Sequence, residues 1–256
     1  MRDDGLDRAI GAAGGVGELA RKIGISQPSV SNWNKVPAQR VIAVEAATGV
    51  PRNDLRPDLY GEQTAAPVDP VDAARAQEYA LLATLLSAPP SRRLLDQFAA
   101  LTGDATPLGR AHAALAEAAS DTGAKIEREY FDLFVGLGRG ELLPYASYYL
   151  TGFLNERPLS RLRADMTALG IERVANNSEP EDHAAILCEI MSGFADGSFD
   201  VRPEAQRAFF EKHVSPWFGR LFADMESAGS ARFYRAVGAL GRAFIEIETE
   251  AFKFAN

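Results

Sequence analysis

The chain has 256 residues, of which 46% are hydrophobic, and its 27 Lys or Arg against 35 Asp or Glu give a net charge of −8. This length allows a sizeable hydrophobic core and one or two domains. The acidic balance argues against a body that coats nucleic acid or an anionic membrane unaided, and it suits basic partners. A single cysteine, Cys188, excludes an internal disulfide bond.

The segment VGELARKIGISQPSVSNWNKVP, residues 16–37, is typical of a helix-turn-helix. Apolar residues recur at helical spacing in its first helix: Leu19, Ala20 and Ile23. Gly24 suits a left-handed helix end. Ser26 is a good N-cap for a second helix, whose first turn tolerates Pro28.

The second helix of this motif has an inward face and a polar face. Val30 and Trp33 lie three residues apart and are expected to face inward. The polar face contains Gln27, Ser29, Ser31 and Asn32. Because Gln and Asn can bond adenine through two atoms and Ser can reach phosphates, this face favours DNA binding in a major groove. The alternative is an ordinary helical hairpin with a polar face in water.

The segment after this motif is PAQRVIAVEAATGVPRNDLRPDLY, residues 37–60. Together with the motif, it makes the first sixty residues resemble the Cro-like, YdaS-type family of phage-related regulators. The resemblance implies a head over residues 1–60. It assigns six residues to a DNA interface, with Gln27, Pro28 and Asn32 at the base edges and Ser29, Lys35 and Arg40 near phosphates. Residues 1–61 carry eight basic and seven acidic side chains. Since phosphate neutralisation supplies much of DNA affinity, this head needs a homodimer or a partner to bind tightly.

Residues 61–72, GEQTAAPVDPVD, are polar and aperiodic, which is typical of a linker. In residues 73–256, apolar residues recur at helical spacing, and no segment alternates like a good strand. The clearest stripes are Tyr79, Leu82, Leu85 and Leu86; Leu94, Leu95, Phe98 and Leu101; and Phe233, Val237, Leu240, Phe244 and Ile247. The sequence therefore predicts an all-α fold, with a helix-turn-helix head joined by a linker to a helical bundle.

Two loops of the body carry candidate binding residues: VGLGRGELLPYASYY at residues 135–149 and NNSEPEDH at residues 176–183. In the second loop, Asn177 or Ser178 could cap the following helix, and the acids would then lie where its dipole favours them. This capping alternative does not explain His183, although a lone histidine is more often structural than functional.

Three motifs of the body together resemble the TorD/DmsD family, and the resemblance runs from about Ala73 to Phe252. They are EPEDH before an apolar helix, PYASYYLTG about thirty residues earlier, and EYFDLFVG before that. Its members are cytoplasmic all-α chaperones that bind the twin-arginine leader and apo-form of molybdenum oxidoreductases until the cofactor is inserted. The resemblance implies a client-binding surface formed by Tyr145, Tyr148 and Tyr149, with Glu179, Asp182 and His183 across from them. Carboxylates pair well with guanidinium groups, and tyrosines add apolar area and cation–π faces.

An enzyme is not expected. The three histidines, His112, His183 and His213, are widely separated and lack metal-ligand spacing. His183 and Cys188 would not meet on one helix face, because five residues correspond to about 140° of rotation. GLGRG lacks the Lys-Ser/Thr of a phosphate loop. We expect no catalytic residue, no metal and no cofactor.

The sequence thus predicts a cytoplasmic chaperone for a molybdoenzyme precursor or its leader, with a DNA-binding head. No apolar run approaches the roughly twenty residues that span a bilayer, and no secretory signal follows Met1, so we expect no membrane insertion. One alternative is a transcription regulator whose TorD-like body senses client or cofactor status. Another is a head that mediates dimerisation or protein contact without DNA.

Overall fold

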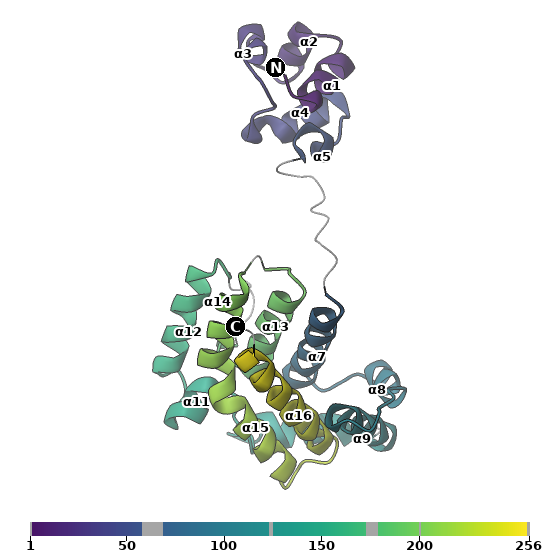
Figure 1. The fold of residues 1–256 in the computed structure, drawn as a ribbon, viewed down its shortest axis with the longest axis vertical. Coiled ribbons are helices and arrows are strands. Elements are labelled where there is room, and N and C mark those ends of the chain that lie inside the picture. Colours follow the sequence, from purple (N-terminus) through teal and green to yellow (C-terminus); the bar gives the residue numbers. More distant parts are fainter. Residues whose placement is uncertain (1, 58–68, 123–124, 173–178, 200, 255–256) are drawn as a thin grey trace. The chain divides into compact units, whose positions relative to one another are not determined.

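The computed structural model describes residues 2–57, 69–122, 125–172, 179–199 and 201–254. The chain divides into two compact units, residues 1–67 and residues 68–256. Within the described ranges the regular structure is helical, apart from one isolated β-bridge (Figure 1). The predicted all-α fold is confirmed.

The head unit is built from short helices: α1 (Asp4–Ala13), α2 (Val16–Lys22), α3 (Gln27–Ser31), the 3₁₀ helix η1 (Ala38–Arg40), α4 (Val41–Thr48) and α5 (Arg52–Leu55). Gly24, between α2 and α3, has a φ of 67°, the left-handed conformation that the sequence predicts. The N–H of Ile25 then donates to the carbonyl of Ala20 over 3.0 Å, which turns the chain inward. Fully buried side chains from several helices, including Leu6, Leu19, Val30, Val44 and Leu55, form a separate small core.

The body contains α7 (Pro70–Ser87), α8 (Arg92–Ala99), α9 (Pro107–Thr122), α10 (Ile126–Tyr130), the π-helical turn η3 (Phe131–Val135), α11 (Ala146–Thr151), α12 (Arg157–Ala168), α13 (Ala184–Ala195), α14 (Pro203–Phe209), the π-helical turn η4 (Phe210–Val214), α15 (Ser215–Ser227) and α16 (Phe233–Phe254). In Figure 1, α8 and α9 lie at one side of the body and α11 and α12 at the other, with α7, α13, α15 and α16 between them. The predicted linker ends earlier than expected, because Asp69 caps the N–H of Val71 and α7 begins at Pro70. Its residues 61–68 lie outside the described ranges.

The core of the body collects the predicted apolar stripes. The buried members of those stripes are Tyr79, Leu82, Leu85, Leu86, Leu95, Phe98, Phe233, Val237, Leu240 and Phe244. Close packing of α15 on α16 requires a glycine, since a Cβ at Gly241 would overlap the ring of Phe222. The prediction for Ile247 is wrong: its side chain is 44% exposed, and Ile245 and Glu248 are buried instead.

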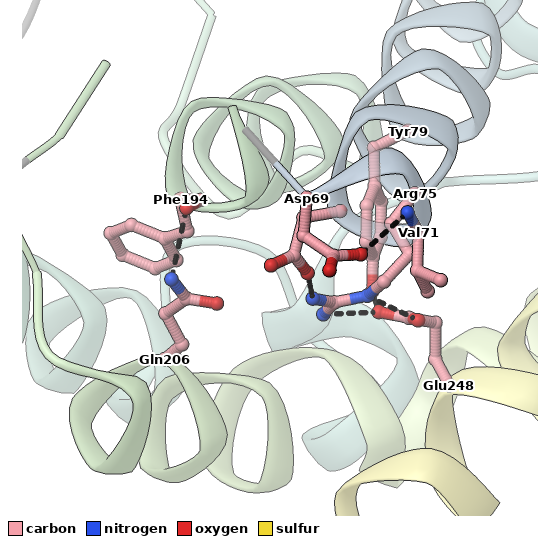
Figure 2. Close-up of polar contacts among 8 residues, drawn as sticks. Asp69, Val71, Arg75, Tyr79, Phe194, Gln206 and Glu248 are labelled. Atoms are coloured by element: carbon pink, nitrogen blue, oxygen red, sulfur yellow. Dashed lines mark hydrogen bonds and ion pairs between the residues drawn. The ribbon is translucent and has the colours of Figure 1, made fainter. Parts of the chain in front are cut away.

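A buried ion pair joins α7 to α16 (Figure 2). The Arg75 guanidinium donates to both carboxylate oxygens of Glu248 over 2.8 and 2.9 Å. Tyr79 donates to the same carboxylate over 2.9 Å, and Asp72 accepts from Arg75 over 2.6 Å. The Glu248 side chain is 1% exposed, so these donors compensate for the loss of its hydration.

Candidate functional site

The two loops that carry the EPEDH and PYASYY motifs meet at the starts of α11 and α13. Tyr145 and His183 form an antiparallel bridge. The N–H of Ala146 donates to the carbonyl of Asp182 over 2.9 Å, and the N–H of Ala184 donates to the carbonyl of Pro144 over 2.8 Å. This pairing fixes the first residues of the two helices against each other.

The helix after the EPEDH motif begins later than the capping alternative predicts. Its N-cap is His183 and its first residue is Ala184. A start capped by Asn177 or Ser178 is therefore wrong, and both of these residues lie outside the described ranges. No acidic residue lies in the first turn of α13, so the helix dipole does not account for the acids of the motif.

Asp182 caps the neighbouring helix. Its side chain is 0% exposed, and Oδ2 accepts the N–H of Ser147, in the first turn of α11, over 2.8 Å. Among the described residues, Asp182 Oδ1 and the hydroxyl of Ser147 have no hydrogen-bond partner. The Asp182 carboxylate is thus enclosed by the protein and held by α11.

His183 caps its own helix. Its Nδ1 accepts the N–H of Ala185 over 3.2 Å, which requires this nitrogen to be unprotonated. Burial lowers the pKa of His183, while the nearby carboxylates of Glu179 and Asp182 act in the opposite direction. The imidazole therefore sits in the structure as a neutral acceptor, and its ring meets the Tyr145 ring edge to face at 5.0 Å.

Glu179 is the acid of this cluster that is only half-buried. Its carboxylate accepts a hydrogen bond from the hydroxyl of Tyr145. Burial first, and then this bond to Glu179, raise the pKa of Tyr145 above its ordinary range, so the phenol stays protonated. The structure therefore brings four predicted residues together: Tyr145, Glu179, Asp182 and His183.

The other two predicted tyrosines follow on α11 and contact different elements. Tyr149 donates to Asp224 of α15 over 3.0 Å, and the guanidinium of Arg220 lies 5.3 Å from its ring centre. Tyr148 accepts a hydrogen bond from Arg139 over 2.7 Å. Asp224 was not predicted, because no local pattern links it to a tyrosine 75 residues away.

One further acid of the motif has a structural partner that was not predicted. Glu181 is 5% exposed, and its carboxylate pairs with Arg163 of α12 over 2.7 Å. The EPEDH element thus contacts α11, α12 and α13 within a few residues.

The candidate DNA interface lies on α3 and the segment that follows it. All six predicted side chains are exposed where the structure describes them: Gln27, Pro28, Ser29, Asn32, Lys35 and Arg40. Val30 is fully buried and Trp33 packs against the head core, as predicted. The hydroxyls of Ser26 and Ser29 lie 2.7 Å apart, so Ser26 does not bond a backbone N–H of α3.

The described ranges hold neither a metal-binding cluster nor a membrane-spanning helix. They contain no group of three or more His, Cys, Asp or Glu side chains placed to hold a metal ion. They also contain no helix whose length and apolar character would let it cross a membrane.

Comparison with known proteins gives a match for each unit. Residues 101–223 match the family model described as nitrate reductase delta subunit, and residues 6–64 match the one described as bacterial toxin YdaS. The chaperone protein TorD of Vibrio cholerae is 28% identical over 135 residues, which are 49% of this chain and 61% of that protein. TorD of Aliivibrio fischeri is 27% identical over 143 residues, 51% of this chain and 65% of that protein.

The alignments thus span a little under two thirds of the length of these curated relatives. The residues matched by the nitrate reductase delta subunit model include both loops of the client-site prediction. The two resemblances stated from the sequence are confirmed: the body is similar to the TorD chaperones and the head is similar to YdaS.

Proposed function

We propose that the body is a maturation chaperone that acts in the cytoplasm and binds the twin-arginine leader and apo-form of a molybdenum oxidoreductase, with no catalytic step of its own. The observation that carries this proposal is the half-buried carboxylate of Glu179, held by the Tyr145 hydroxyl beside two paired helix starts. The similarity to the TorD chaperones of Vibrio cholerae and Aliivibrio fischeri supports it.

A carboxylate in this environment suits a guanidinium group. Charge-assisted hydrogen bonds are strong, and a partly desolvated setting strengthens them further. The rings of Tyr148 and Tyr149 add cation–π faces, and each already lies near an arginine of the chain. In this proposal Glu179 accepts one leader arginine and Asp224 accepts the second, while Asp182 and His183 hold the helix starts in place.

A synthetic leader peptide tests the proposal. This arginine peptide carries two adjacent arginines before an apolar stretch, and a matched lysine peptide carries two lysines in their place. We expect Glu179→Gln in the full chain to weaken arginine-peptide binding by about tenfold or more, since a hydrogen bond to a charged group contributes about 1.5–3 kcal/mol. Isothermal titration calorimetry measures this, with Glu117→Gln, exposed on α9, as the matched control.

The lysine peptide should bind more weakly, because an ammonium group cannot pair with a carboxylate in the two-pronged way of a guanidinium. Equal binding of the arginine peptide to Glu179→Gln and to the unaltered chain contradicts the assigned role of Glu179. No binding to the unaltered chain contradicts the leader proposal as a whole.

We propose that the head binds duplex DNA through α3. Burial of Val30 and packing of Trp33 in the head core turn the predicted polar residues outward, which supports this proposal. The test begins with a duplex selected by the full chain from a random pool at low salt. The double variant Gln27→Ala/Asn32→Ala should lose tenfold or more of its preference for that duplex, because each two-bond base contact contributes about 1–3 kcal/mol.

Retained preference in the double variant contradicts this interface. Failure to select any duplex at low salt favours the alternative of a head used for protein contact. If the leader peptide changes the affinity for the selected duplex, the regulator alternative gains support, since coupling requires the two ligands to affect each other equally.

A further inference from the structure

Exposed apolar side chains of the body are concentrated in two short stretches of its sequence, on either side of the PYASYY loop. Of the nine large hydrophobic side chains that are strongly exposed among the described residues, five lie in residues 135–137 or 150–154. They are Val135, Leu137, Leu150, Phe153 and Leu154. Scattered exposed apolar residues need no explanation, whereas a concentration of them marks a contact site for another molecule.

The most exposed of these side chains stands on a tight turn. Leu137 is 96% exposed and lies between Gly136 and Gly138, whose φ angles are 63° and 90°. A Cβ at Gly136 would overlap the carbonyl of Arg139, so this turn requires a glycine. The N–H of Gly136 also donates to the carbonyl of Phe131 over 2.7 Å. The backbone is therefore organised to hold Leu137 outward.

A second turn presents Phe153, which is 70% exposed. Gly152 is the C-cap of helix α11; its φ is 85°, and its N–H donates to the carbonyl of Tyr148 over 2.8 Å. The Thr151 hydroxyl accepts the N–H of Phe153 over 3.3 Å. Asn155, shortly beyond, has a φ of 60°, which is uncommon outside glycine. This turn, too, is specified by its backbone and exposes an aromatic side chain.

Arg139 links the two turns. It follows the Leu137 turn, donates to the Tyr148 hydroxyl over 2.7 Å, and lies 5.2 Å from the centre of that ring. It makes no ion pair with a carboxylate of the described residues. Since a guanidinium has five N–H donors, most of them can still bind an incoming acceptor. We call Leu137, Arg139, Tyr148 and Phe153 the apolar rim.

We propose that the apolar rim docks an apolar segment of an unfolded client polypeptide that carries a carboxylate at one end. Leu137 and Phe153 bury against its apolar side chains, and Arg139 pairs with its carboxylate. A carboxylate complements the positive charge of Arg139, whereas a segment that ends in lysines does not. The inference rests on the proposed chaperone function, and it adds a client contact separate from the leader site.

Three labelled peptides test it by fluorescence anisotropy with the full chain. They share one leucine- and phenylalanine-rich core and end in two Glu, two Gln or two Lys. We expect the Glu peptide to bind most tightly. Leu137→Ser and Phe153→Ser should each weaken binding of all three peptides by about tenfold, the loss typical of an interface anchor. Arg139→Gln should lower the affinity of the chain for the Glu peptide to its affinity for the Gln peptide.

Val71→Ser is the matched control, since Val71 is 67% exposed on α7. The inference is overturned if the rim variants bind like the unaltered chain, or if Val71→Ser weakens binding equally. It is also overturned if sedimentation shows a dimer that Phe153→Ser dissociates, because a second copy then covers the rim. Leader-peptide binding measured in parallel separates the two proposals: loss of leader binding with rim binding intact contradicts the leader site alone.

Discussion

Two adjacent residues of the EPEDH motif cap two different helices. Asp182 accepts an N–H at the start of α11, and His183 accepts one at the start of α13. The first N–H groups of a helix have no partner inside the helix. Each cap therefore accepts a hydrogen bond from an N–H group that would otherwise be buried and unpaired. The motif therefore has a structural task that precedes any binding role.

Removal of the Asp182 cap should destabilise the body. Asp182→Ala leaves the Ser147 N–H unpaired in a buried setting, and we expect a loss of about 1–3 kcal/mol in the free energy of unfolding. Asp182→Asn keeps an oxygen acceptor and should lose less. Urea unfolding followed by circular dichroism measures both variants. Equal stability of Asp182→Ala and the unaltered chain would show that the cap contributes nothing.

His183 should make stability depend on pH. Burial lowers its pKa in the folded chain below the ordinary value of about 6.5, so the unfolded chain binds a proton more readily. The contribution of His183 to the free energy of unfolding is fully present above about pH 6.5, and it decreases as the pH falls towards the lowered pKa. His183→Asn keeps a capping side chain without the titration. Urea unfolding at pH 7.5 and 5.5 should therefore show a smaller decrease for the variant than for the unaltered chain.

The sequence predicted that four of the six candidate residues lie together, but it did not predict their contacts. Tyr145, Glu179, Asp182 and His183 lie together, yet histidine is not a preferred N-cap, so composition could not identify His183 as one. The bond from Tyr149 to Asp224 and the placement of Arg139 on Tyr148 depend on tertiary packing. Local spacing carries no information about either.

At the scale of helices, the apolar pattern predicted which segments are helical and most of what they bury. In the last apolar stripe, residues 233–247, only the final residue is not buried as predicted. Its steps of four and three residues follow a repeat of 3.5, whereas a straight helix has 3.6 residues per turn, so the stripe drifts off the buried face. Ile247 is exposed for this reason, and Glu248 is buried beside Ile245. Its partner Arg75 is 173 residues away, which no helical pattern could reveal.

The ion pair between α7 and α16 should respond asymmetrically to substitution. Arg75→Met leaves Glu248 buried with only the Tyr79 hydroxyl, and we expect a loss of about 3 kcal/mol. Glu248→Gln should cost less, because Arg75 is 18% exposed and still has Asp72. Urea unfolding of both variants measures the difference. An equal or larger loss in Glu248→Gln would contradict this account.

At the scale of the whole chain, two units with separate cores carry different charges. Residues 1–61 have a net charge of +1, and the remaining residues carry nineteen basic and twenty-eight acidic side chains. No residue belongs to both hydrophobic clusters. The two resemblances already indicated two units, because each covers its own part of the sequence.

Separate cores predict separate responses to core substitutions. Leu19→Ala removes a fully buried side chain of the head, which costs about 2–5 kcal/mol in a well-packed core. Hydrogen exchange followed by mass spectrometry should then increase within residues 2–57 and stay unchanged within residues 69–254. Leu240→Ala, in α16, should give the reverse pattern. Faster exchange in both ranges after either substitution would show that the units depend on each other.

The bridge between Tyr145 and His183 also bears on the order of folding. Helices form from neighbouring residues, whereas this contact joins segments about 35 residues apart. Closing such a loop costs conformational entropy before the contact can stabilise the chain. The bridge should therefore form late, after the helices around it are in place. A nascent chain that has helices but not this bridge would not yet hold Tyr145 beside Glu179, so the site becomes available only when folding of the body is nearly complete.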